Sequence, residues 1–229
     1  MKIVSWNCRG GFRNKIERII SLNADIYVIQ ESENPDNYPK LKNRIKNYFY
    51  IGESDKYKGL LIFSMNENVI LKHAGWEDFY RRYFIPVIAN NNCIIVGLWA
   101  CDPYIHEFYF YLKLIKRYFT DKPIVFIGDI NSNKCFDHRH PREGSHSDTI
   151  ALLNSWGYES IYHYFTGEEQ GNESVPTFRM YNHKDKPYHI DFCFAKPELI
   201  KYFEIVENNN FEECSDHNPL YVEFIDQKL

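Results

Sequence analysis

Five short polar clusters each stand at one end of an apolar, strand-like run, and this arrangement constrains the fold more than any other feature. Three of them close their runs: Ser5-Trp6-Asn7, Gln30-Glu31 and Gly128-Asp129-Ile130-Asn131. Two precede their runs: His189-Ile190-Asp191 and Ser215-Asp216-His217. If the strands after the last two clusters run opposite to the others, all five clusters gather on one rim of a sheet sandwich.

The rest of the pattern predicts an α/β fold with two sheets packed face to face, mostly antiparallel, and flanked by helices. Ile105, Phe108, Leu112, Ile115 and Phe119 recur at three- and four-residue steps, which indicates an amphipathic helix. Apolar runs predict strands over residues 2–6, 25–30, 59–64, 68–71, 83–88, 93–99, 123–127, 177–181, 190–195, 202–206 and 219–224. We also expect helices over 12–20 and 147–156, a hairpin turn at 90–92 and a loop over 207–213.

The length and composition favour one domain over residues 1–229. Hydrophobic residues make up 44% of the chain and aromatic residues 17%, which is enough for a sizeable core and unlike a disordered chain. The formal net charge of -4 supplies no overall cationic field. A nucleic-acid partner would therefore have to be met by a local basic patch.

The six cysteines show no CxxC spacing, and several fall inside apolar runs. They are typical of small core side chains in a reducing compartment. The chain begins a strand almost at once, without a signal-peptide pattern, and no apolar run approaches the about 20 residues that a membrane-spanning helix needs. We expect a soluble, cytoplasmic protein with no membrane partner. The sequence does not fix the oligomeric state, although a monomer is favoured.

The polar clusters contain the groups that metal-assisted cleavage of a phosphate ester needs. A phosphodiester repels hydroxide unless its charge is neutralised, and a divalent cation held by carboxylates does this. Because Mg²⁺ prefers oxygen ligands, Glu31 is the best candidate ligand, with Asn7 and Asp216 nearby on the predicted rim. Asp129 follows an apolar strand that we expect to be buried, and it is suited to accept a proton from water.

Three further polar residues complete the predicted chemistry. Asn131 can hold the nucleophile or a phosphoryl oxygen through its amide, and His217 can donate to the pentacoordinate phosphate. The imidazole needs a carboxylate that fixes its tautomer, and Asp191 is our choice. Taken singly, each residue has an ordinary interpretation as a turn, a strand end, a structural carboxylate or a packed histidine. Their joint occurrence in this order favours the catalytic interpretation.

This ordered set resembles the endonuclease/exonuclease/phosphatase superfamily, which includes DNase I, exonuclease III, apurinic/apyrimidinic endonucleases, sphingomyelinases and inositol-polyphosphate phosphatases. The resemblance extends over essentially the whole chain. It implies a four-layered α/β sandwich, dependence on Mg²⁺ or Mn²⁺, and hydrolysis of phosphoesters. The implied metal residues are Glu31, Asn7 and Asp216, and the implied catalytic residues are Asp129, Asn131, Asp191 and His217.

One position departs from the family's pattern. The family usually places a Tyr or His just after the strand that precedes the long central helix, and here that strand ends near Trp99. An indole N–H can donate a hydrogen bond but cannot act as an acid or base. Tyr104 or His106 could fold back to substitute, so the group that protonates the leaving group stays unassigned. Trp99 itself is either part of the substrate pocket or a core residue.

Two basic stretches are candidates for substrate contact. The loop after Asn131 contains Lys134, Arg139 and Arg142, with His146 shortly after, and would grip flanking phosphates. The alternative is a solvated charged loop, since acidic residues are interspersed. A second stretch begins at Arg179 and, with Arg81-Arg82, would form a groove for single-stranded bases. The predicted substrate-binding residues are Trp99, His146, Arg179 and Arg142.

These features predict a Mg²⁺-dependent nuclease that acts on DNA or RNA. One alternative is a phosphatase or a sphingomyelinase-like enzyme that acts on small or lipid phosphoesters. Another is a catalytically impaired nucleic-acid-binding domain, although binding alone would not require so many anionic groups facing phosphate.

Overall fold

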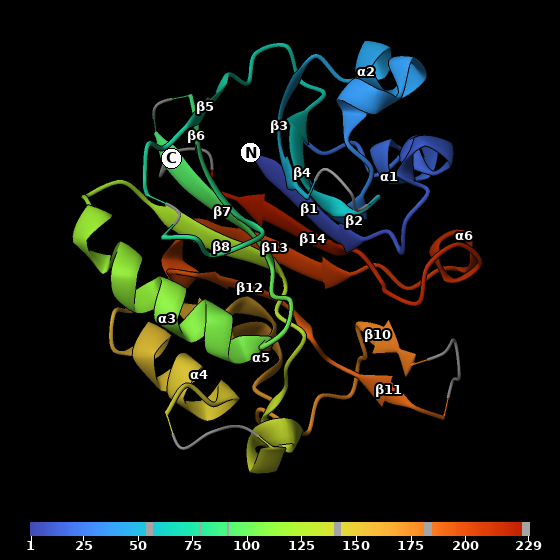
Figure 1. The fold of residues 1–229 in the computed structure, drawn as a ribbon. Coiled ribbons are helices and arrows are strands. Elements are labelled where there is room, and N and C mark those ends of the chain that lie inside the picture. Colours follow the sequence, from blue (N-terminus) through green and yellow to red (C-terminus); the bar gives the residue numbers. More distant parts are fainter. Residues whose placement is uncertain (54–56, 78, 91, 140–142, 181–184, 226–229) are drawn as a thin grey trace.

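A computed structural model gives the fold of residues 1–53, 57–77, 79–90, 92–139, 143–180 and 185–225. Two six-stranded sheets pack face to face, and helices cover their outer faces (Figure 1). This arrangement confirms the predicted four-layered α/β sandwich. Both sheets are mixed, because each contains one parallel pair among antiparallel ones.

The first sheet joins strands from both ends of the chain. In sheet order its strands are β13 (Ile200–Ile205), β14 (Leu220–Phe224), β1 (Lys2–Asn7), β2 (Ile26–Ser32), β4 (Gly59–Ser64) and β3 (Asn47–Gly52). β1 runs parallel to β2 and antiparallel to β14. The carboxyl ends of β1 and β2 therefore lie at the same edge as the start of β14.

The second sheet repeats this organisation. In order its strands are β5 (Leu71–His73), β6 (Phe84–Ala89), β7 (Cys93–Trp99), β8 (Ile124–Asp129), β12 (Asp191–Ala195) and β9 (Glu159–Ser160). β7 and β8 are parallel, and β12 runs antiparallel to β8. A separate ribbon of β10 (Phe178–Arg179) and β11 (Pro187–Tyr188) projects beside the sandwich.

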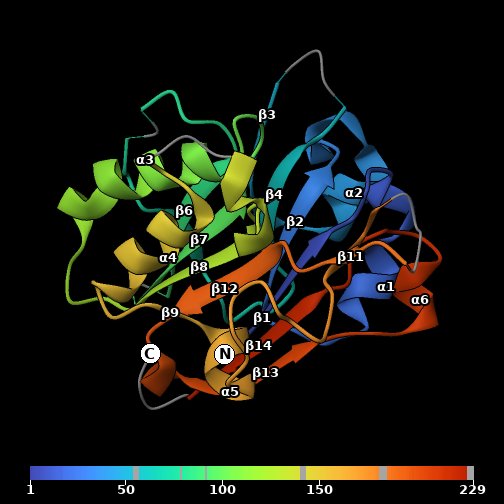
Figure 2. The same cartoon turned by 90° about the horizontal axis from the view of Figure 1, so that it is seen from below.

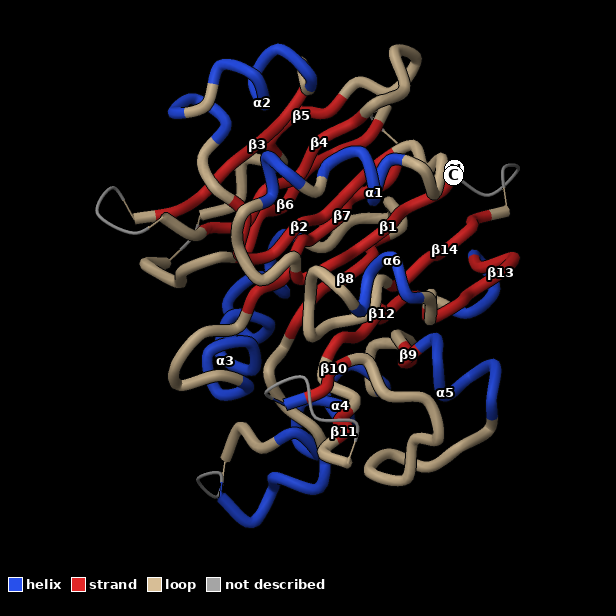
Figure 3. The backbone as a smooth tube through the Cα atoms, turned by 90° about the vertical axis from the view of Figure 1, so that its right-hand side faces the viewer, coloured by secondary structure: helices blue, strands red, loops and turns tan. Residues whose placement is uncertain are grey.

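Helices supply the outer layers. The α3 helix (Ile105–Ile115) and α4 (His146–Asn154) cover the second sheet, whereas α1 (Ile16–Ile20), α2 (Pro39–Arg44) and α6 (Asn209–Glu212) lie over the first sheet (Figure 3). The α5 helix (Ile161–Thr166) lies against β12 and β13 at one edge of the sandwich (Figure 2). Short 3₁₀ helices span Phe12–Asn14, Pro35–Asn37, Lys116–Tyr118, Lys134–Arg139 and Pro197–Leu199.

Three apolar layers hold the sandwich together. The central layer between the sheets includes Val28, Ile62, Ile95 and Ile127, all fully buried. Gly97 lies in this layer, where an added Cβ would stand 2.7 Å from Ile62 Cδ1, so the sheets approach closely at this point. The two outer layers pack each sheet against its helices. Removing such surface from water is the main favourable contribution to folding.

Most predicted elements are confirmed, with ends shifted by a few residues. The turn expected at 90–92 and the strand expected over 177–181 extend outside the described residues, and the described part of that strand is β10 alone. The strand expected over 68–71 is wrong, because β5 begins only at Leu71 and Ile70 is 57% exposed. The loop expected over 207–213 contains α6, whose Phe211 packs edge-on against Trp6. We did not predict β3, α2 or α5. Within the described part of the chain, no helix is long and apolar enough to cross a bilayer.

Candidate active site

The predicted polar clusters meet at one rim of the sandwich. Asn7 and Gln30 are register partners on the parallel strands β1 and β2. Asp129 and Asp191 are register partners on the antiparallel strands β8 and β12, one at the end of its strand and the other at the start. The expected opposition of strand directions is therefore confirmed, and it gathers segments that are remote in sequence.

Asn7 connects the two sheets. Its amide nitrogen donates to Asp129 Oδ2 at 3.0 Å and lies 3.4 Å from Glu31 Oε1. Its Oδ1 instead accepts from the backbone N–H of Arg9 at 3.0 Å. The amide nitrogen of Asn7 therefore positions two carboxylates. Its Oδ1 keeps a second lone pair, and the role of Asn7 as a metal ligand stays a prediction.

Glu31 points to the rim because β2 is irregular at this position. The strand does not stop at Glu31 but continues to Ser32, and its register against β4 shifts between Ile29 and Ser32. Glu31 adopts φ 59°, a left-handed conformation that is unusual for a non-glycine residue. A bulge of this kind re-aims a side chain. The carboxylate forms an ion pair with Lys58, which precedes β4.

Asp129 is held by a tight turn at the end of β8. The backbone N–H of Asn131 donates to Asp129 Oδ1 at 2.8 Å, and the Asn131 amide donates to Oδ2 at 3.0 Å. Gly128 has φ 147°, and an added Cβ would lie 2.0 Å from the Leu98 carbonyl oxygen. Only glycine fits here, because a side chain would collide with the neighbouring strand. The turn leaves Asp129 fully buried.

His217 and Asp191 form a buried pair. His217 Nδ1 donates to Asp191 Oδ2 at 2.8 Å, and both side chains are almost fully buried. Trp6 Nε1 donates to the His217 carbonyl at 3.0 Å. Ser215 Oγ donates to the Asn7 carbonyl at 2.7 Å and accepts from the His217 N–H. These bonds fix the loop that carries His217 against the end of β1.

The buried charges at the rim perturb one another. Burial raises the pKa of Asp129 from 3.8 to about 7, and the neighbouring carboxylate of Asp191 adds to this rise. Burial alone would lower the pKa of His217, but Asp191 and Asp129 overcome it and raise that pKa from 6.5 to about 9. At neutral pH the imidazole is therefore charged, and Asp129 is poised to exchange a proton.

Two groups of side chains are candidates to hold a divalent cation. Glu31 and Asp216 are partly exposed and already attract positive groups: Glu31 pairs with Lys58, and Asp216 lies 3.5 Å from Arg9 Nε. Hard oxygen donors of this kind suit Mg²⁺ or Mn²⁺. The buried Asp129, Asp191 and His217 also place ligand atoms within 4.8 Å of one another and can hold a metal. A charged imidazole cannot ligate a metal until it loses its proton.

The predicted substrate-binding residues have different outcomes. His146 is fully buried in α4, and its Nε2 lies 3.1 Å from Gln170 Oε1. Burial lowers the pKa of His146 from 6.5 to about 4, so it is a neutral interior residue and out of reach of a substrate. Arg142 lies outside the described residues. Trp99 is partly buried and packs on Tyr83 at 4.6 Å between ring centroids, which accounts for it as a packing residue.

The arginines of the expected basic groove are already paired with carboxylates. Arg179 bonds to Asn218 Oδ1 at 3.0 Å and pairs with Glu207 and Glu212. The two arginines before β6 are likewise neutralised, because Arg81 pairs with Glu107 and Arg82 with Glu53. We therefore do not retain a groove of uncompensated arginines. Arg179 still stands next to the site, since its backbone N–H donates to the Asp216 carbonyl.

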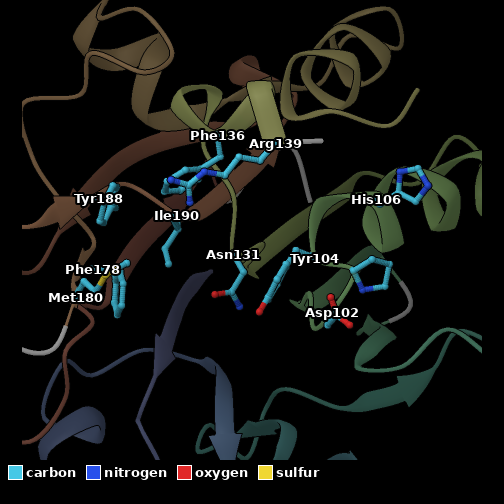
Figure 4. A pocket seen from close by; sticks show the side chains of 11 residues that line it. Asp102, Tyr104, His106, Asn131, Phe136, Arg139, Phe178, Met180, Tyr188 and Ile190 are labelled. Atoms are coloured by element: carbon cyan, nitrogen blue, oxygen red, sulfur yellow. The ribbon is translucent and has the colours of Figure 1, made fainter. Parts of the chain in front are cut away.

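A cavity of about 590 Å³ opens beside Asn131 (Figure 4). Tyr104 lies on one side, and Phe178 and Tyr188 from the β10–β11 ribbon lie on the other. The sequence suggested Tyr104 only as a possible substitute for the Tyr or His that the family usually has. It did not indicate that Phe178, Tyr188 or Lys58 would lie at the site. Lys58 reaches Glu31 because Ser32 pairs with Gly59. The sequence alone holds no signal for that register.

The comparisons with known proteins agree with this geometry. A model of the endonuclease/exonuclease/phosphatase family matches residues 4–217. The chain belongs to this family. Its fold is similar to an AP endonuclease from Archaeoglobus fulgidus, with a TM-score of 0.71 at 16% identity, covering 98% of this chain and 99% of that one. No curated protein sequence matches the chain.

Two further solved structures share the fold. One is a variant of the 3′ phosphatase NExo from Neisseria bound to a product DNA hairpin, with a TM-score of 0.69 and 18% identity over 98% of this chain and 99% of that one. The other is the Xenopus laevis APE2 catalytic domain, with a TM-score of 0.67 and 16% identity over 98% and 91%. At these identities the likeness shows the fold alone.

Proposed function

We propose that this protein is a divalent-metal-dependent phosphodiesterase that hydrolyses DNA or RNA, with Mg²⁺ or Mn²⁺ as its cofactor. The single observation that supports this function best is the convergence of Glu31, Asp129 and the Asp191–His217 pair on one rim. Family membership supports phosphoester hydrolysis as the reaction class. The DNA-processing neighbours, one of them bound to a DNA hairpin, support nucleic acid as the substrate.

Each residue has a role that follows from its surroundings. Asp129 accepts a proton from the attacking water, since its pKa of about 7 matches the working range of a general base. Asn131 orients Asp129 through its amide nitrogen, which also donates to the Ala100 carbonyl at 3.1 Å, and its Oδ1 can accept a hydrogen bond from the attacking water. His217, charged and held by Asp191, donates to the phosphate as negative charge develops there. Glu31 and Asp216 would hold the cation, which neutralises the phosphate when bound.

Tyr104 is our candidate for the position at which the family usually has a Tyr or His. It lies between β7 and α3, adopts φ 57°, and lines the same cavity as Asn131. Figure 4 shows its ring directed toward Asn131 within the cavity. A phenol can donate a hydrogen bond to a phosphate oxygen and can also give up its proton, whereas the indole of Trp99 can only donate a hydrogen bond.

The test is metal-dependent hydrolysis by purified protein, assayed on DNA, RNA and a panel of inositol, nucleotide and lipid phosphoesters. We expect cleavage of nucleic acid with Mg²⁺ or Mn²⁺ and none with EDTA. Asp129→Ala and His217→Ala should each lower the rate by about 10²- to 10⁴-fold. Asp36→Ala and His73→Ala, two exposed residues outside the site, serve as matched controls. Full activity of both site variants would refute the assignment.

A further inference from the structure

We infer that Lys58 binds a phosphate of the substrate once a divalent cation has taken Glu31 from it. The structure shows Lys58 paired with Glu31, one of the residues proposed to hold the cation. This inference rests on the proposed function, because it takes the Glu31 carboxylate as a metal ligand. It adds a link between the metal and nucleic acid, since each should strengthen the binding of the other.

The fold brings Lys58 to the rim from outside the polar clusters. Lys58 precedes β4, and the pairing of Ser32 with Gly59 places it beside the bulge that carries Glu31. Its side chain runs past the turn after β1, since a Cβ added to Gly10 would lie 3.4 Å from Lys58 Cε. The side chain is 48% exposed. The ammonium group can therefore leave Glu31 without opening the core.

Lys58 differs from other basic residues around the rim in the partner that it has. Three arginines there pair with carboxylates that have no proposed role in the reaction: Arg81 with Glu107, Arg82 with Glu53, and Arg179 with Glu207 and Glu212. Arg9 lies near the candidate ligand Asp216, but at 3.5 Å, which is longer than an ordinary hydrogen bond. Lys58 is hydrogen-bonded to its carboxylate. A cation at Glu31 therefore changes the surroundings of Lys58 most directly.

The Glu31 carboxylate cannot neutralise both the ammonium group and a divalent cation. Lys58 donates to Glu31 Oε2, and Oε1 lies 3.4 Å from the amide nitrogen of Asn7. A divalent cation on this carboxylate would cancel its negative charge and repel the neighbouring ammonium group. Lysine carries a point charge on a flexible stem, so Lys58 can turn to another anion within reach. The phosphates of the substrate are the anions that the proposed function brings to this rim.

The overall charge of the protein makes one released lysine important. A chain with a formal net charge of -4 has no general attraction for nucleic acid, so binding depends on local cations. While Glu31 neutralises Lys58, the ammonium group attracts a phosphate only weakly. Its release adds a phosphate contact. Because coupling between two sites is reciprocal, nucleic acid should tighten metal binding by the same factor.

Acetylation of Lys58 in the wild-type protein tests this release directly. Mass spectrometry would follow its reaction with an N-hydroxysuccinimide ester in EDTA, in Mn²⁺, and in Mn²⁺ with a single-stranded oligonucleotide whose phosphorothioate linkages resist cleavage. We expect Mn²⁺ to raise the rate at Lys58 about fivefold and the oligonucleotide to reverse this rise. Lys201 pairs with Glu223 near the start of β1, at the other end of the sheet, and is the matched control. An unchanged rate at Lys58 in Mn²⁺, or no protection by the oligonucleotide, would overturn the inference.

A second experiment needs neither metal nor catalysis. Glu31→Gln removes the charge that holds Lys58, so in EDTA this variant should bind the same oligonucleotide about fivefold more tightly than the wild-type protein, as measured by fluorescence anisotropy. Most of this gain should vanish when Glu31→Gln is introduced into Lys58→Met. Asp36→Asn, which releases Lys42 outside the site, is the matched control and should show no gain. A gain of equal size with and without Lys58 would overturn the inference, because the loss of a negative charge would then explain it.

Cleavage assays separate this inference from the proposed function. If the protein cleaves nucleic acid with Mg²⁺ or Mn²⁺ but Lys58 shows neither release nor protection, the proposed function stands and the inference is wrong. If Lys58 shows both and no phosphoester is cleaved, the hydrolase proposal is wrong. Lys58 then remains a phosphate-binding residue that the metal controls.

Discussion

Replacing Asp191 with Asn removes the partner that keeps His217 charged. In the wild-type protein the Asp191 carboxylate accepts from His217 Nδ1 at 2.8 Å, and both side chains are buried. Asn has the same shape but no charge, so the exchange changes electrostatics more than packing. We expect Asp191→Asn to lower the rate at neutral pH and to move the alkaline limb of the pH profile to lower pH.

The magnitude follows from the pKa of His217. Its rise from 6.5 to about 9 corresponds to about 3 kcal/mol in favour of the charged form, at about 1.4 kcal/mol per pH unit. Burial opposes this rise, and Asp191 is the largest contribution in favour of it. Without Asp191 the pKa should therefore fall toward or below 6.5. At about pH 8 most molecules would then have a neutral imidazole, and the rate should drop by about 10²-fold or more.

The sign of the pH dependence is fixed by which form donates. Charged His217 is present below its pKa, so wild-type activity should hold up to about pH 9 and decline above it. The variant should decline from about pH 6 upward, near the ordinary pKa of a histidine. The assay is kcat/KM across the neutral and alkaline range on a chromogenic phosphodiester at saturating Mg²⁺. Imidazole NMR shifts in the metal-free protein report the pKa of His217 directly.

Asp36→Asn is the matched control, because Asp36 is an exposed carboxylate that pairs with Lys42 outside the site. Its profile should match that of the wild-type protein. If Asp191→Asn keeps its activity within a few-fold and its alkaline limb stays near pH 9, Asp191 does not keep His217 charged. The same conclusion follows if NMR shows an unchanged pKa for His217 in a folded variant.

Three further predictions concern metal binding and stability. Lys58→Met removes a cation that competes with a metal for Glu31. Because this partly exposed ion pair is worth at most about 1 kcal/mol, we expect the variant to bind Mn²⁺ up to about fivefold more tightly, as measured by calorimetry. Weaker binding would contradict this. Mg²⁺ at about 100 times its Kd should raise the free energy of unfolding by about 2.7 kcal/mol in the wild-type protein and clearly less in Glu31→Gln, as measured by thermal denaturation with and without EDTA. Burial gives His146 a pKa of about 4 in the folded protein, against 6.5 in the unfolded chain. The free energy of unfolding should therefore fall by about 3 kcal/mol as the pH falls from 6.5 toward 4. Urea unfolding of His146→Phe should show a shallower loss of this free energy over the same range, and an equal slope would contradict the prediction.

The sequence was sufficient for those parts of the site that local pattern and strand direction determine. Asn7, Asp129 and Asp191 stand at strand ends, and the requirement that the clusters share a rim predicted how those strands run. Glu31 lies at the rim as predicted, but it does not follow the end of its strand. A bulge inside β2 directs its side chain to the rim. Bulges depend on register with a partner strand, and a single strand's sequence does not reveal that register.

Other features depend on contacts that are remote in sequence. His146 looked like part of a basic loop, but the Ser145–Asp148 capping box starts α4 directly before it and turns its ring inward toward Phe192. Arg179 looked free, yet its partners Glu207 and Glu212 lie in the segment around α6 that we expected to be a plain loop. The sequence shows where the positive residues are, whereas their pairing with carboxylates depends on tertiary structure.

The distribution of charge at the rim bears on which group accepts the proton from water, a role that local sequence cannot assign. Glu31 pairs with Lys58, Asp216 lies against Arg9, and Asp191 holds His217. Among the described residues, Asp129 alone in this set is held by neutral amides and by no Lys or Arg. Burial and the neighbouring carboxylate of Asp191 raise its pKa to about 7, although the charge of His217 partly opposes this rise. Asp191 accepts directly from the charged His217, whereas the described hydrogen bonds to Asp129 come only from amides, so Asp129 is the carboxylate better placed to take up a proton near neutral pH.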